Sequence, residues 1–342
     1  MKRYLPLLGA FILGATSLGA DAPMDWTKAE GPVAASEWGV FLTTLWVDVG
    51  ILIIVGGLLT YAIFKFRAKE GDDTPPKQVH GNIKLEVGIM VVSALLLVVI
   101  EIPNVKAIWY TASPPEGREV MDINIIGHQW WWEVEYPSLG IKTANEIMIP
   151  VGKVVNFHLA SADVIHSFWV PRLGGKLDLI PGKVNQLWLE ADKPGEYYGQ
   201  CAELCGVSHA NMRLRVFAQT DEDFEIWVSS QLEGAALPES DSAEEGEALF
   251  LSKGCIACHT ARDIPGALGI IGPDLTHVGS RGMIASGVLP NTDEAMASWI
   301  QDPEAIKPGN IMSRDGPMYN GTLEELTPSE VEALVAFLRG LK

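Results

Sequence analysis

Two long apolar stretches dominate the first third of the chain. Residues 40–64 contain a single charged side chain, Asp48. Residues 85–102 have carboxylates only near their ends, at Glu86 and Glu101. A helix needs roughly 20 apolar residues to cross a bilayer core, so the pattern predicts two transmembrane helices. The loop between them is basic, with Lys65, Arg67, Lys69, Lys77 and Lys84. Short basic loops stay in the cytoplasm, which places both ends of the chain outside.

The first residues have the pattern of an export signal. Two basic residues precede an apolar run from Leu5 to Leu18, and small residues before Asp21 offer a cleavage site. We therefore predict a signal peptide over residues 1–20 and a transmembrane helical hairpin over residues 21–110. A short helix that is not cleaved is the alternative, and both interpretations describe an exported chain.

After residue 110 the pattern changes to short, partly alternating segments separated by Gly and Pro turns. Segments such as 154–159 and 186–190 show it. This texture is typical of an all-β sandwich or barrel, which we expect over residues 111–228. A polar stretch rich in Ser, Glu and small residues follows and is interpreted as a linker, residues 229–243. The pattern of residues 244–342 is helical and predicts an all-α domain.

Composition narrows the functional classes. The formal net charge of −18 at pH 7 argues against nucleic acid as a partner. The four cysteines form two close pairs, Cys201 with Cys205 and Cys255 with Cys258. Each pair belongs to a candidate ligand or attachment motif, so no cysteine is left over for a structural disulfide.

One loop combines several soft metal ligands. Cys201, Cys205, His209 and Met212 fall within twelve residues. Thiolate, thioether and imidazole together favour copper over magnesium or calcium. Two thiolates four residues apart can face a common centre and bridge a pair of coppers that share one electron. Two alternatives stay open: a zinc site, which has little use for methionine, and a disulfide, which leaves the histidine and methionine unexplained.

The same loop resembles the binuclear copper A loop of cytochrome c oxidase subunit II, whose pattern is Cys-x-Glu-x-Cys-x3-His-x2-Met. The resemblance implies a cupredoxin-like Greek-key barrel in which Cys201 and Cys205 bridge two coppers. It also implies four further ligands: His209, Met212, the backbone carbonyl of Glu203, and His166 in a similar upstream motif. The resemblance further assigns the Glu203 side chain to a magnesium ion shared with subunit I.

Two more residues take roles from this resemblance, which covers about residues 35–220. The segment 127–133 is similar to an aromatic segment near the copper site, and it makes Trp130 the surface residue through which electrons enter from cytochrome c. The alternative is a core or interface tryptophan. Glu86 matches a carboxylate at the cytoplasmic mouth of a proton path into subunit I, and its alternative is a solvated carboxylate at a helix end.

Cys255-x-x-Cys258-His259 is the attachment motif of c-type haem. Its two thiols add to the haem vinyl groups, and His259 becomes an axial iron ligand. The domain also resembles small cytochromes c in a Gly-Pro-x-Leu segment and in a Pro-Gly-x-x-Met segment ending at Met312. Met312 is the expected sixth ligand, and a methionine there raises the reduction potential. Met318 is the alternative, because the family's proline directly after the methionine is absent at Met312.

Together these motifs predict the subunit at which electrons enter a proton-pumping cytochrome c oxidase. Single electrons would pass from a cytochrome c or a respiratory complex to haem c, to copper A and on to subunit I, where oxygen is reduced to water. The expected partners are subunits I and III. The expected location is the plasma membrane of a bacterium, with a multi-pass anchor and both cofactor domains on the periplasmic side. The linker would keep the haem close to the copper by raising its effective concentration.

Two other functions stay open. One is the electron-accepting subunit of a copper A-containing nitric oxide reductase, and the other is a stand-alone membrane-tethered electron carrier. A quinol oxidase subunit II is disfavoured, because those relatives lack the copper ligands that are present in this chain.

Overall fold

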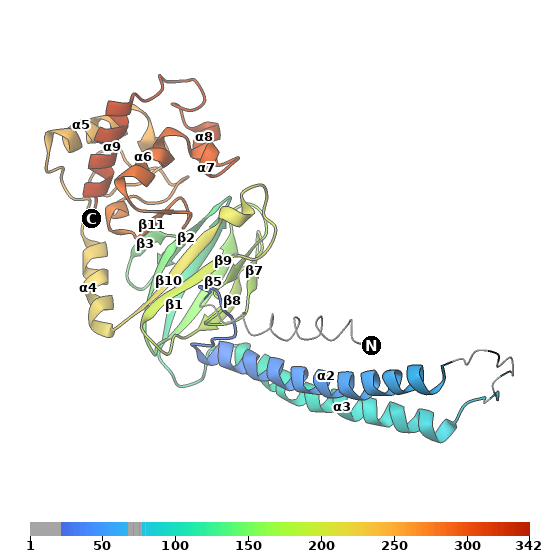
Figure 1. Cartoon of the computed structure of the whole chain (residues 1–342). Coiled ribbons are helices and arrows are strands. Elements are labelled where there is room, and N and C mark those ends of the chain that lie inside the picture. The colour runs from blue at the N-terminus through green and yellow to red at the C-terminus, as the bar shows by residue number, and fades with distance from the viewer. Residues whose placement is uncertain (1–21, 68–70, 72–74, 76, 79) are drawn as a thin grey trace.

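The computed structural model describes residues 22–67, 71, 75, 77, 78 and 80–342. The signal peptide predicted at residues 1–20 lies outside the described residues. The described chain consists of a helical hairpin, a two-sheet β domain and a C-terminal helical domain, with the β domain in the middle (Figure 1). The multidomain fold class predicted from the sequence is confirmed.

The helical hairpin is formed by α2 (Pro32–Lys65) and α3 (Ile83–Thr111), which lie side by side and project away from the β domain (Figure 1). Pro32 suits the first turn of α2, where its missing N–H costs no helical hydrogen bond. Asn82 caps α3, because its side chain accepts a hydrogen bond from the Leu85 N–H at 3.2 Å. Both helices are long and apolar enough to cross a membrane, and the most apolar stretch of each helix is exposed. Such surfaces suit contact with lipid.

The β domain is a sandwich of two five-stranded sheets, with strand orders β3-β2-β1-β5-β8 and β4-β10-β9-β6-β7. The pairs β1–β5 and β4–β10 are parallel, and the other neighbours are antiparallel. The strands are β1 (Val120–His128), β2 (Trp131–Tyr136), β3 (Ile141–Ala144), β4 (Glu146–Pro150), β5 (Val154–Ser161), β6 (His166–Trp169), β7 (Leu177–Leu179), β8 (Asn185–Leu189), β9 (Gly195–Cys201) and β10 (Arg213–Gln219).

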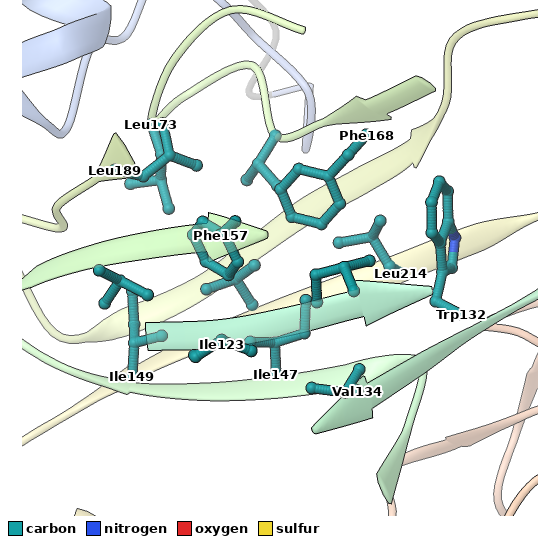
Figure 2. Packing of buried hydrophobic residues seen from close by; sticks show 14 of the residues in the cluster. Ile123, Trp132, Val134, Ile147, Ile149, Phe157, Phe168, Leu173, Leu189 and Leu214 are labelled. Carbon is teal, nitrogen blue, oxygen red and sulfur yellow. The ribbon is translucent and has the colours of Figure 1, made fainter. Parts of the chain in front are cut away.

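The core of the sandwich follows from the alternation along the strands. In β1, Ile123 and Ile125 are fully buried while the residues between and before them are not. Figure 2 shows Ile123 among side chains from both sheets, including Phe157 and Phe168. Full burial of each such side chain stabilises the fold by about 1.5–3 kcal/mol. Trp132 fills one end of this core, where its ring lies 6.1 Å from that of His166. The rigid core therefore supports the edge that carries the predicted metal ligands.

The C-terminal domain is helical and is organised around the contact between α5 and α9. Gly246 allows this contact, because a Cβ at its position would lie 2.0 Å from the Ala333 carbonyl oxygen. Phe250 and Phe337 pack between the same helices with ring centroids 5.5 Å apart. The elements are α5 (Asp241–Ser252), η2 (Cys255–Ala257), η3 (Val278–Ser280), β11 (Met283–Ile284), β12 (Leu289–Pro290), α6 (Asp293–Gln301), α7 (Pro303–Ile306), α8 (Ile311–Asp315) and α9 (Pro328–Gly340).

The connection between the two domains is shorter than the sequence suggests. The linker was expected at residues 229–243, but α4 (Asp221–Leu232) extends into this stretch and α5 begins at Asp241. Thr220 caps α4 by accepting a hydrogen bond from the Asp223 N–H at 3.2 Å. Three acidic residues in its first turn suit the positive end of the helix dipole. Only residues 233–240 remain as an irregular connection.

The helical domain packs directly on the β domain through polar contacts. The Glu146 carboxylate of β4 accepts hydrogen bonds from the N–H groups of Gly282 and Met283, at 3.2 and 2.8 Å. Elsewhere in the interface, the Ser208 hydroxyl donates to the Pro308 carbonyl at 2.7 Å. These contacts hold the helical domain over the end of the sandwich that lies away from the hairpin (Figure 1).

Candidate copper and haem sites

The soft ligands of the predicted copper loop converge at one edge of the β domain. Cys201 is the last residue of β9, and the short helix η1 (His209–Asn211) follows it in the same loop. The sulfurs of Cys201 and Cys205 are 3.7 Å apart. Cys205 Sγ also lies 3.6 Å from His209 Nδ1 and 3.9 Å from the Met212 sulfur. The loop therefore folds its four predicted side chains around one small volume.

His166 completes this cluster from the neighbouring strand. It is the first residue of β6, which pairs with β9, and its side chain is buried. Its Nδ1 lies 4.0 Å from Cys201 Sγ, and the Glu203 carbonyl oxygen lies 3.2 Å from the same sulfur. The structure thus brings together all five side chains and the backbone oxygen that the resemblance assigned to copper.

Asp163 belongs to the site, although the sequence analysis did not identify it. Its carboxylate lies 2.8 Å from His166 Nε2 and accepts hydrogen bonds from the Gln129 and Val164 N–H groups, both at 2.6 Å. A carboxylate on the outer nitrogen orients a metal-binding imidazole, and here it leaves Nδ1 facing Cys201. The position of Asp163, three residues before the histidine, was the signal that could have revealed it.

The charge state of the thiols suits a metal. Contact with Cys205 lowers the pKa of Cys201 to about 3 despite the opposing effect of burial. The neighbouring sulfur and burial raise the pKa of Cys205. One thiolate therefore forms readily, and a metal ion would displace the remaining proton, as metal binding to thiols requires.

The geometry also bears on the alternative sites. The two thiols are free, and their 3.7 Å separation is far longer than the ~2.05 Å of a disulfide bond. A structural zinc site takes four Cys or His ligands, whereas this cluster adds a thioether and a carbonyl oxygen. The donor set therefore fits copper best.

A cavity in the helical domain adjoins the haem-attachment motif. Its lining includes Cys255, Cys258, His259 and both candidate methionines, Met312 and Met318. Most of the other lining side chains are aliphatic or aromatic. Two thiols, an imidazole and a thioether around an apolar cavity are the groups that a covalently attached haem needs.

His259 has the arrangement of an axial ligand. Its Nδ1 lies 2.8 Å from the Pro273 carbonyl oxygen, which leaves Nε2 free for iron. Burial lowers the pKa of His259 more than this hydrogen bond raises it, so the ring is held neutral. Gly272 lies against the ring, where a Cβ would be 2.5 Å from Cε1. The chain therefore fits a haem at this motif.

Comparisons with known proteins agree with the two domain types that carry these sites. Residues 138–219 match the family described as "Cytochrome C oxidase subunit II, periplasmic domain", and residues 243–342 match "Cytochrome c". The chain is 38% identical to cytochrome c oxidase subunit 2 of Alkalihalophilus pseudofirmus, in an alignment that covers 100% of this chain and 97% of the relative. The chain belongs to the cytochrome c oxidase subunit 2 family.

Two other members of this family show its range. Cytochrome c oxidase subunit 2 of Bacillus subtilis is 36% identical, with 92% of this chain and 91% of the relative covered. Quinol oxidase subunit 2 of Bacillus cereus is 32% identical, with 69% of this chain and 81% of the relative covered. Relatives named for different electron donors, cytochrome c and quinol, are therefore similar to this chain over most of its length.

Trp130 lies at the interface of the two domains, and only 6% of it is exposed. Its Nε1–H donates to the Cys205 carbonyl at 2.9 Å. The Lys307 ammonium donates to its backbone carbonyl, and a Cβ on Gly309 would lie 3.2 Å from its ring. Trp130 was expected at the surface, but the helical domain covers it. The structure therefore places it as the interface tryptophan that the sequence analysis kept as its alternative.

The axial methionine candidates differ in their setting. Met312 lies in the short helix α8, which Asn310 caps by accepting a hydrogen bond from the Ser313 N–H at 2.8 Å. Met312 is partly exposed, whereas Met318 is 6% exposed. Both line the haem cavity, so the structure brings both to the place where a sixth ligand is needed.

The remaining predicted residues are carboxylates on loops and helix ends. Glu86 is exposed in the first turn of α3, and its Oε1 accepts a hydrogen bond from the Asn82 N–H at 3.2 Å. Together with the Asn82 cap, this contact gives Glu86 a structural role at the start of the helix. The Glu203 side chain, within the copper loop, accepts a hydrogen bond from the Leu204 N–H at 3.2 Å and is partly exposed.

Proposed function

We propose that this chain is the subunit at which single electrons enter a proton-pumping cytochrome c oxidase. Electrons pass from a cytochrome c or a respiratory complex to a covalent haem c, then to a binuclear copper A centre, and on to subunit I, where oxygen is reduced to water. The hairpin α2–α3 anchors the chain beside subunits I and III in the plasma membrane of a bacterium. Both cofactor domains lie on the periplasmic side.

Trp130 is the observation that carries this proposal, because it contacts both cofactor sites. It lines the haem cavity, and its indole nitrogen donates to the carbonyl of Cys205 at 2.9 Å. Trp130 therefore connects the haem cavity to the copper loop within a single chain. This position suits a relay between the two sites.

The grouping of the copper ligands supports a binuclear centre. Cys201 Sγ lies close to the His166 ring and the Glu203 carbonyl oxygen. Cys205 Sγ lies close to the His209 ring and the Met212 thioether. Donors of terminal type therefore surround both sulfurs, and the two sulfurs lie close enough together that two coppers could share them. A copper pair bound at these ligands would accept and release a single electron.

The other roles follow the same scheme. Cys255 and Cys258 form the thioether bonds of the haem, His259 is its proximal ligand, and Met312 is its sixth ligand, with Met318 as the alternative. The Glu203 side chain contributes to a magnesium site shared with subunit I. Glu86 stands at the start of a proton path into that subunit.

The donor is assigned by the motifs that this chain contains. A relative is named as a subunit of quinol oxidase, so membership of the family alone leaves the donor open. The complete copper ligand set and the haem attachment motif in this chain favour oxidation of a cytochrome c.

Metal and haem analysis of the soluble part, residues 110–342, tests the cofactor content. We expect two copper atoms for each covalent haem. A well-folded fragment that holds only zinc, or a disulfide between Cys201 and Cys205, would overturn the proposal.

Electron transfer tests the route. Rapid reduction of the haem in the intact oxidase should be followed by reduction of the copper, and Trp130→Phe should slow this step because it removes the hydrogen bond to Cys205. Trp299→Phe is the matched control, since Trp299 also lines the haem cavity but makes no described hydrogen bond to the copper loop. Equal transfer rates in the two variants would exclude the route through Trp130.

A further inference from the structure

Residues 208–213, which run from the copper loop into the start of β10, are bonded to the helical domain at several points. The Ser208 hydroxyl donates to the Pro308 carbonyl at 2.7 Å, and only 1% of Ser208 is exposed. The Asn211 side-chain amide donates to the Ile306 carbonyl at 3.4 Å. Both carbonyls lie at the end of α7 or directly after it, so this part of the helical domain lies against the copper loop.

A second part of the helical domain, the turn between β11 and β12, holds the end of the same segment. The Arg213 N–H donates to the Ser286 carbonyl at 3.1 Å. The Ser286 hydroxyl donates back to the Arg213 carbonyl at 3.1 Å, and only 3% of Ser286 is exposed. The segment 208–213 is therefore attached to the helical domain at both ends and in the middle.

These contacts bear on two of the predicted copper ligands. His209 and Met212 both lie inside the attached segment, and both are close to the Cys205 sulfur. His166 is held within the β domain instead, by the pairing of β6 with β7 and β9 and by the Asp163 carboxylate. One part of the copper site is therefore built by the β domain, and the other part also depends on the helical domain.

We propose that docking of the helical domain positions His209 and Met212 for copper, so that copper binding and domain docking stabilise each other. This inference rests on the proposed function, because it takes the loop to hold copper. A loop that already has its ligand-bound shape loses less conformational freedom when the metal binds. Ser208, Asn211 and Ser286 are then positioning residues, which act through the loop. Because coupling between two binding events is reciprocal, bound copper in turn holds the loop in the shape that the helical domain fits.

Release of copper from the assembled oxidase tests this coupling. Ser208→Ala removes the hydrogen bond to Pro308, and copper should then pass to an excess of chelator roughly 2- to 10-fold faster, the effect of one hydrogen bond. Ser286→Ala should act in the same direction, although it leaves the sequence of the copper loop unchanged. Ser252→Ala is the matched control, because the Ser252 hydroxyl donates to the Ala248 carbonyl at 2.8 Å within α5. Loss of the copper absorption measures release, while the haem absorption stays constant.

Hydrogen exchange measures the reverse effect, that of copper on docking. The N–H groups of Gly282 and Met283 donate to Glu146 across the interface, so their exchange follows undocking of the helical domain. Removal of copper from the wild-type oxidase should accelerate this exchange by roughly 5- to 150-fold, the range typical of coupled sites. The acceleration should be smaller in Ser208→Ala, because part of the coupling is lost.

Equal release rates in Ser208→Ala, Ser286→Ala and Ser252→Ala would overturn the positioning role. Exchange in the wild type that does not depend on copper would overturn it as well. This second measurement needs no substitution, so it decides the question if neither of the first two variants assembles. A wild-type oxidase without two coppers would instead overturn the proposed function, which keeps the two failures distinguishable.

Discussion

Gly309 offers a direct test of how closely the helical domain is seated on Trp130. Its backbone has φ +75°, and a Cβ at its position would lie 2.9 Å from Val207 Cγ2 and 3.2 Å from the Trp130 ring. Gly309→Ala therefore adds two costs. A residue with a side chain is destabilised by about 1–2 kcal/mol in the left-handed backbone conformation. The added methyl group also overpacks the interface, which destabilises it by about 1–3 kcal/mol.

Gly321 separates these two costs. Its φ is +78°, and no atom lies within 4 Å of the position that a Cβ would take. Gly321→Ala therefore has the backbone cost alone, in the same domain. The difference between the two variants isolates the contact with Val207 and Trp130, which we expect to weaken docking of the helical domain by about 1–3 kcal/mol.

Hydrogen exchange at the interface measures this difference. The N–H groups of Gly282 and Met283 donate to Glu146 only while the domains are docked. A factor of ten in exchange corresponds to about 1.4 kcal/mol, so Gly309→Ala should accelerate exchange in this segment by roughly 5- to 150-fold relative to Gly321→Ala. The haem absorption spectrum must be the same in both variants, which shows that a change in iron ligation does not cause the faster exchange. Equal exchange in the two variants would refute the close seating of Gly309 on Trp130.

Three further predictions concern the ligands and the interface. Cys201→Ser should remove the copper absorption and leave the haem spectrum unchanged, and retention of both coppers would contradict the bridging role. Burial raises the pKa of Glu146, so the docked state holds this proton more tightly, and docking should weaken as pH rises through that raised pKa. Glu146→Gln should remove this pH dependence of exchange at Gly282, and a pH profile like that of the wild type would assign it to another group. Met312→Leu should abolish the methionine–iron charge-transfer band while Met318→Leu keeps it, and the reverse result would make Met318 the ligand.

The copper and haem motifs could be found in the sequence because their chemistry is local. The thiols and imidazole of each motif are separated by a few residues, so one loop or one helical turn brings them together. His166 lies 35 residues before Cys201 and could be included only through a resemblance. The pairing of β6 with β9 is what brings its ring to the sulfur.

The fold class was also accessible, because each part has its own periodicity. Long apolar runs predict the hairpin, alternation predicts the sandwich, and the amphipathic end of the chain predicts α9. The length of the linker was not accessible in the same way. Its Ser- and Glu-rich composition resembles an irregular connection, yet Ser240 and Thr220 are helix caps, and acidic residues beside them suit the first turn of a helix.

The contacts between the two domains could not be predicted from the sequence pattern. Glu146 and Lys307 look like ordinary surface charges in a chain with many of them, yet each is only 4% exposed in the docked arrangement. The same arrangement changes the interpretation of Trp130, because Lys307 and Gly309 of the helical domain lie against it.

This cover changes what the fusion of the two domains achieves. A flexible linker raises the effective concentration of a donor and leaves each encounter to diffusion. Here Glu146, Ser208 and Trp130 receive fixed contacts from the helical domain, so the haem cavity is held at one position beside the copper loop. A separate donor protein has no access to Trp130 while this contact persists, because only 6% of the residue is exposed. For the electron route proposed above, the rate of transfer would therefore depend on the stability of one interface rather than on the length of the connection.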